Sequence, residues 1–97
     1  MRIYEINEGE ESPITKNQMD FLQQTIRNKP ADYFEYEVIN LGTKFVIVEK
    51  QTEIIVYETL SDDEADHLCD QFNQDKDVGK DALDYSLNKN RKIYNLF

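Results

Sequence analysis

Residues 33–59 read YFEYEVINLGTKFVIVEKQTEIIVYET and contain three short runs with the composition of β-strands. In the first run, residues 33–41, apolar and polar side chains alternate, which predicts a strand with one face toward the core. The other two runs, residues 44–49 and 53–59, are rich in β-branched residues and almost continuously apolar, so we expect both of their faces to be at least partly covered. Short links force consecutive strands to run antiparallel, so the stretch predicts a three-stranded meander. The core-facing residues of the first run are expected to be Phe34, Tyr36 and Val38.

The next stretch, LSDDEADHLCDQFN at residues 60–73, predicts an α-helix over residues 62–74. Ser61 and Glu64 have the spacing of a capping box, and Leu60 is placed to pack against the first apolar residue of the helix. Apolar side chains then recur with helical spacing, which predicts one buried face. These residues are Ala65, Leu68, Cys69 and Phe72.

A helix before the meander is predicted over residues 16–28. Thr15 and Gln18 form a capping box, and Pro30 ends the helix because the residue before a proline avoids the α region. Its buried stripe is expected to contain Met19, Leu22 and Ile26.

After the acidic helix, residues 73–79 have the composition of a linker, and a third helix is predicted near residues 80–91. Ala82, Leu83 and Leu87 supply its apolar face.

The two ends of the chain carry weaker patterns. Residues 1–7 fit a short strand and residues 7–12 a polar loop. Residues 89–97 form a possible tail that is first basic and then apolar; it either docks on the domain, which we favour, or binds a partner. The prediction is therefore one small acidic α+β domain over residues 1–97, with the element order β-α-β-β-β-α-α.

Composition excludes several classes of protein. A net charge of −9 argues against a protein that binds nucleic acid directly, because such proteins need a basic surface, and it argues equally against docking on anionic membranes. From the first residues of the sequence we expect no signal peptide, and from its apolar runs no membrane span. Cys69 is the only cysteine, so no intramolecular disulfide is expected. These features favour a cytoplasmic location.

We expect no catalytic set, metal site or cofactor. His67 and Cys69 stand two positions apart and point to different sides of a helix, so they cannot form a nucleophile–base pair. Three glycines cannot supply a phosphate-binding loop. Residues 73–84 carry acids at EF-hand spacing, but the required turn glycine comes one residue late, at Gly79. The protein is therefore predicted not to be an enzyme.

The distribution of charge is the remaining feature. Residues 61–84 contain nine acids and only two lysines. Acids in the first turn stabilise a helix, but Asp66 and Asp70 lie further along, where repulsion between like charges is unfavourable. A surface that only aids solubility remains open as an explanation of these acids. The functional interpretation predicts a partner-binding surface made of Asp62, Asp63, Asp66, Asp70, Asp75, Asp77, Asp81 and Asp84.

A short acidic domain without a catalytic set, with the Asn-, Lys- and Ile-rich composition of AT-rich genomes, resembles inhibitors encoded by phages and mobile elements. That class includes anti-CRISPR, anti-restriction and DNA-mimic proteins, although no particular motif carries the resemblance. It implies a non-enzymatic inhibitor that occupies the basic nucleic-acid site of an enzyme, in a bacterial host cell if the chain is encoded by a phage. The alternative is a small regulatory or adaptor protein that binds its partner through a sheet edge or the apolar C-terminal tail.

Overall fold

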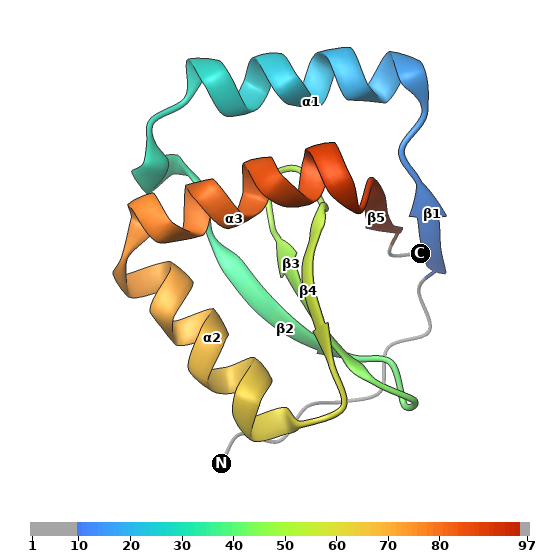
Figure 1. The fold of residues 1–97 in the computed structure, drawn as a ribbon, viewed down its shortest axis with the longest axis vertical. Coiled ribbons are helices and arrows are strands. Elements are labelled where there is room, and N and C mark those ends of the chain that lie inside the picture. The colour runs from blue at the N-terminus through green and yellow to red at the C-terminus, as the bar shows by residue number, and fades with distance from the viewer. Residues whose placement is uncertain (1–9, 96–97) are drawn as a thin grey trace.

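A computed structural model of the protein describes residues 10–95 and has the predicted α+β architecture (Figure 1). The element order is β-α-β-β-β-α-α-β, which adds one C-terminal strand to the predicted order. The strand predicted at residues 1–7 lies outside the described residues. The elements are β1 (Glu10–Pro13), α1 (Lys16–Asn28), the 3-10 turn η1 (Ala31–Tyr33), β2 (Tyr36–Asn40), β3 (Phe45–Glu49), β4 (Ile55–Thr59), α2 (Asp62–Gln74), α3 (Lys76–Lys89) and β5 (Lys92–Asn95).

The predicted meander is confirmed as an antiparallel sheet with the strand order β2-β3-β4. Its first turn is closed by a 2.9 Å hydrogen bond from the Leu41 N–H to the Lys44 carbonyl, and Gly42 adopts a φ of 87° within it. Such a backbone conformation favours glycine because the residue has no Cβ to clash. The side chains of Phe34, Tyr36 and Val38 are buried, as their alternation predicted.

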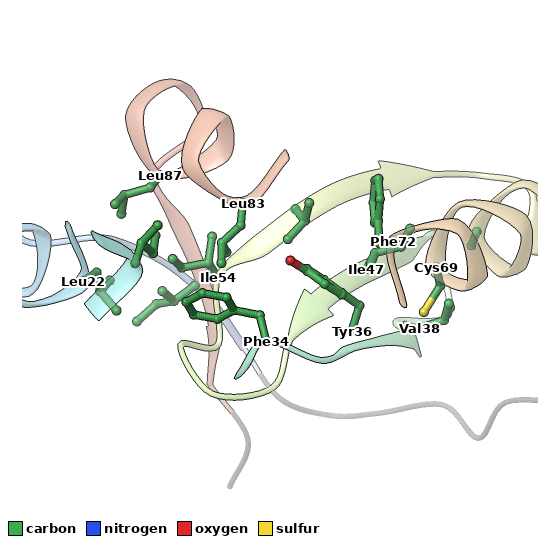
Figure 2. Close-up of a cluster of buried hydrophobic side chains, with 14 residues drawn as sticks. Leu22, Phe34, Tyr36, Val38, Ile47, Ile54, Cys69, Phe72, Leu83 and Leu87 are labelled. Atoms are coloured by element: carbon green, nitrogen blue, oxygen red, sulfur yellow. The ribbon is translucent and has the colours of Figure 1, made fainter. Parts of the chain in front are cut away.

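Two apolar clusters lie on opposite faces of this sheet. On one face, side chains from α1, α2 and α3 pack against the strands, and Figure 2 shows this cluster. The second cluster consists of Ile39, Val46, Val48, Ile55 and Tyr94. The nearly continuous apolar runs of β3 and β4 are thus explained, because both faces of these strands are covered.

A buried carboxylate holds the turn between β3 and β4. Glu49 is fully buried, and its Oε1 accepts hydrogen bonds from the Thr52 N–H at 2.7 Å and the Thr52 hydroxyl at 2.8 Å. Its carboxylate also accepts from the Gln51 N–H and the Glu35 N–H, both at 3.0 Å. A buried charge is tolerated when several donors satisfy it, and these donors tie the turn to the segment that precedes β2.

Helix α1 has the predicted bounds, and both halves of the Thr15–Gln18 capping box are present. Leu22 and Ile26 are buried, while Met19 is partly buried against the same cluster. The predicted stripe of this helix is therefore confirmed.

Helix α2 also has its predicted bounds, but its N-terminus differs from the prediction. The Ser61 hydroxyl accepts from the Glu64 N–H at 3.2 Å, whereas the Ser61 N–H donates to the Thr59 hydroxyl at 3.1 Å. The Glu64 carboxylate is consequently directed to another donor, the hydroxyl of Tyr57 at 2.8 Å. The predicted packing of Leu60 against the first apolar residue of the helix is wrong, because Leu60 is 81% exposed.

The predicted linker at residues 73–79 is wrong, because α2 and α3 are separated by Asp75 alone. The Asp75 N–H donates to the Gln71 carbonyl at 2.8 Å, and its carboxylate accepts from the Val78 N–H at 3.3 Å. One residue thus caps the end of α2 and the start of α3.

The third helix was predicted to start near residue 80, but α3 begins at Lys76. Gly79 was assigned to the linker, whereas it has a packing role within α3. A Cβ at Gly79 would lie 2.8 Å from Tyr36 Cε2 and 2.8 Å from the Phe72 carbonyl oxygen. The glycine therefore allows close helix packing rather than forming a turn.

Of the predicted tail, residues 92–95 dock on the domain, and residues 96 and 97 lie outside the described residues. Residues 10–13, which overlap the stretch predicted to be a loop, are the pairing partner. β5 pairs antiparallel with β1, with Ser12 opposite Ile93. Ile93 and Tyr94 are both buried, so these apolar side chains of the tail are not available to a partner. The two strands lie beside the C-terminal end of α3 (Figure 1).

Candidate acidic binding surface

The eight carboxylates predicted to bind a partner fall into two groups by exposure. Three are half-buried, namely Asp62, Asp66 and Asp70. Five are exposed, namely Asp63, Asp75, Asp77, Asp81 and Asp84. The accessible negative charge is therefore concentrated along α3 and at the corner where α2 ends and α3 begins. Less of it lies along the acidic row of α2.

The half-buried acids lie on the flank of α2 that faces β2. Asn73 shares this flank, since it follows Asp66 by seven positions and Asp70 by three, and its side chain bonds to the Tyr36 backbone. Asp66 and Asp70 also have interactions within the molecule. These contacts account for part of the acidic row that helix stability alone did not explain.

The corner between α2 and α3 forms an acidic hollow. Asp75 and Asp77 line it together with Asp32 of η1, in a space of about 460 Å³. Lys76 also lines it, but its ammonium group donates a 2.6 Å hydrogen bond to the Phe34 carbonyl. Sequence reasoning missed Asp32, because only the packing of η1 against α3 brings it to the corner.

Along α3, three exposed acids follow one another at helical spacing on the flank toward α1. Asp77 and Asp81 are one turn apart, about 6 Å along the axis, and Asp84 continues the row. Asp81 and Asp84 line a shallow groove of about 340 Å³ that also contains Arg27 and Lys80. Negative charge is consequently strongest at the corner and is partly offset further along α3.

At the other end of α2, Glu64 is hydrogen-bonded to the end of β4. The Tyr57 hydroxyl, and then that of Thr59, donate hydrogen bonds that lower the pKa of the Glu64 carboxyl below its usual range. The same contact with Glu64 raises the pKa of the Tyr57 hydroxyl. Asp63 and Glu64 are both exposed in the first turn of α2, and Glu64 is the one held by these hydrogen bonds.

The structure keeps apart Cys69 and His67, and it places the acids at EF-hand spacing mostly in a helix. Cys69 is buried and His67 is exposed on another side of α2. The acids at EF-hand spacing lie largely within α3, so they have no calcium-binding loop. Within residues 10–95, no three His, Cys, Asp or Glu side chains are grouped so that they could hold a metal ion.

No protein-family model, curated protein or solved structure matches this chain. Among the helices of the described residues, none is both long and apolar enough to span a membrane.

Proposed function

We propose that this protein is a non-enzymatic inhibitor that binds the basic nucleic-acid site of an enzyme in the cytoplasm of a bacterial cell. Its acidic surface would take the place of the nucleic-acid backbone, so the partner is a basic protein and not DNA or RNA itself. The class resemblance noted from the sequence adds that the chain is encoded by a phage or a mobile element.

The observation that carries the proposal is the acidic corner. Asp32 of η1 meets Asp75 and Asp77, at the start of α3, around one hollow, from which Asp81 and Asp84 continue along α3. Basic grooves built to hold phosphates attract closely spaced negative charge, and such attraction speeds association. The single residue between α2 and α3 supports a fixed shape for this surface.

The proposal is tested by DNA-cleavage assays with a CRISPR nuclease and with a restriction endonuclease, each titrated with the protein. We expect inhibition that weakens as the salt concentration rises, because ion release and charge attraction drive the contact. The triple variant Asp77→Asn, Asp81→Asn, Asp84→Asn should inhibit at least about tenfold more weakly, the equivalent of about 1.4 kcal/mol.

A matched control removes three exposed acids elsewhere: Asp20→Asn, Glu37→Gln and Glu53→Gln. It changes the net charge by the same amount, so it should inhibit as well as the unmodified protein. Equal weakening by the two triple variants would show that total charge acts rather than this surface. The absence of inhibition in both assays would contradict the proposal for these two classes of enzyme.

A further inference from the structure

Strand β4 has an edge that is only partly paired. On one side it pairs with β3. On the other side, among residues 10–95, the pairing with β5 involves only the residues just before β4: Ile54 bridges Ile93, and the Tyr94 N–H donates to the Glu53 carbonyl at 2.9 Å. The rest of this edge, from Val56 to Glu58, faces a groove between β4 and α3. Unpaired strand edges are sites at which another extended chain can add.

The strand register shows which backbone groups are available there. The Lys50 N–H bonds to the Glu35 carbonyl and the Leu41 N–H bonds to the Lys44 carbonyl, at the two ends of the β2–β3 pair. Backbone groups point to alternate sides along a strand, so Val46, two positions from Lys44, also directs its N–H and C=O to β2. Glu58 lies opposite Val46 across the β3–β4 pair. Its own N–H and C=O therefore point away from β3, toward the open edge.

The groove beside this edge has a volume of about 580 Å³. The Ser86 hydroxyl of α3 donates a 2.9 Å hydrogen bond to the Val56 carbonyl, which joins the helix to the strand at the base of the groove. Tyr85 and Tyr57 also line it and are 62% and 38% exposed. Exposed aromatic rings beside a strand edge provide apolar contacts for the side chains of an added chain.

Positive charge gathers at this groove although the protein is strongly acidic. Lys89 and Lys92 both line it and are exposed. The one carboxylate in its lining, Glu58, lies 3.0 Å from the ammonium group of Lys44 and 3.9 Å from that of Lys92. The groove therefore complements an acidic ligand, unlike the helical corner.

We propose that this groove binds an extended segment of a partner protein, which adds to the edge of β4 and places an acidic side chain between Lys89 and Lys92. The backbone of the segment exchanges hydrogen bonds with Glu58, and an apolar side chain packs on Tyr85. None of these contacts uses the acidic corner, so the groove is a second, independent interaction site.

The test uses two labelled octapeptides, TVTVTVEE and TVTVTVKK, which have the same strand-forming part and opposite terminal charges. Titration of the ¹⁵N-labelled protein to about 1 mM, the range of weak peptide contacts, is followed by NMR. We expect the acidic peptide to shift the amide signals of Tyr57, Glu58, Tyr85 and Lys89, and the basic peptide to leave them in place. If neither peptide shifts these signals, or if both shift them equally, the proposal is overturned.

Two variants separate charge from backbone pairing. Lys89→Glu should weaken binding of the acidic peptide by about tenfold. Lys29→Glu makes the same charge change at the end of α1, where the Lys29 carbonyl accepts from Lys80 nine residues along α3 from Lys89, and it should have little effect. Glu58→Pro removes an N–H that the sheet does not use and should abolish binding, since proline is tolerated at such edge positions. Unchanged binding by Lys89→Glu overturns the proposal whether or not Glu58→Pro folds.

Discussion

The side-chain amide of Asn73 forms two hydrogen bonds with the backbone of Tyr36. Asn73 Oδ1 accepts from the Tyr36 N–H at 2.9 Å, and Asn73 Nδ2 donates to the Tyr36 carbonyl at 2.9 Å. The amide thus satisfies the same two groups that a neighbouring strand would satisfy, at the outer edge of β2. It also attaches the last turn of α2 to the sheet, next to the acidic corner.

Replacing this amide should cost stability. Asn73→Ala leaves the Tyr36 N–H and C=O without their partner, so we expect the free energy of unfolding to fall by about 1–3 kcal/mol in urea denaturation. Asn88→Ala is the matched control, because Asn88 is exposed on α3 and its side-chain amide donates a hydrogen bond to the Asp84 carbonyl within the same helix. Equal stability of the two variants would show that the bonds to Tyr36 contribute nothing.

Gly79→Ala tests the packing role of the glycine in α3. Helix propensity alone predicts that alanine stabilises by about 1 kcal/mol. The added Cβ would meet Tyr36 Cε2 and the Phe72 carbonyl oxygen, each at 2.8 Å, and one of these contacts is rigid backbone. We therefore expect a loss of about 1–3 kcal/mol by thermal or urea unfolding. A gain in stability would mean that α3 can shift away without cost.

Glu49→Gln tests the buried carboxylate of the β3–β4 turn. Its oxygens accept hydrogen bonds from three backbone N–H groups and the Thr52 hydroxyl, and an amide would place a donor against some of them. We expect a loss of about 2–4 kcal/mol in the free energy of unfolding. The exposed Glu53→Gln in the same turn should change stability by less than about 0.5 kcal/mol. A similarly small effect at Glu49 would contradict the role assigned to its charge.

The Glu58 carboxyl should make stability depend on pH. Burial alone would raise its pKa, but the hydrogen bond from Lys44 and the charges of Lys44 and Lys92 lower the pKa below its usual value near 4.5. Between the folded and unfolded pKa values, the unfolded chain binds more protons, so stability rises with pH there. The contribution is present above the unfolded pKa and is lost as pH falls through the folded pKa.

Melting temperatures of the protein and of Glu58→Gln, measured from about pH 3 to pH 7, check this expectation. The unmodified protein should melt at a higher temperature at the upper end of the range, and the difference should shrink toward the acidic end. Added salt should reduce the difference, because the pair is partly exposed. A difference that does not vary with pH would show that the ion pair is not responsible.

What could be predicted from the sequence is set by short-range contacts. The bounds of α1 and α2 follow from caps and apolar spacing within each helix, and the meander follows from three runs joined by short links. β1 and β5 were missed because each is four residues long and its pairing partner lies at the other end of the described chain. No pattern within either short segment predicts its pairing with a segment so distant in sequence.

The candidate site was predicted less well, for a related reason. Asp62, Asp66 and Asp70 formed a regular row in sequence, but the row lies beside β2, which helical spacing could not reveal. Asp32 belongs to the acidic corner only through tertiary packing. Gly79 lies in a stretch with the composition of a turn, although its close contact with Tyr36 is what requires a glycine there. Charge could be counted from the sequence, whereas its exposure depended on the packing of neighbouring elements.

The second apolar cluster has a consequence for how the chain folds during synthesis. Four of its buried residues belong to the meander, but Tyr94, which is 1% exposed, leaves the ribosome after all of them. Until Tyr94 emerges, the apolar side chains on that face of the sheet lack its cover and are more exposed to solvent. Until β5 emerges, β1 has no strand with which to pair. Transient exposure of an apolar sheet face favours aggregation, so the nascent protein is most prone to aggregate before β5 emerges.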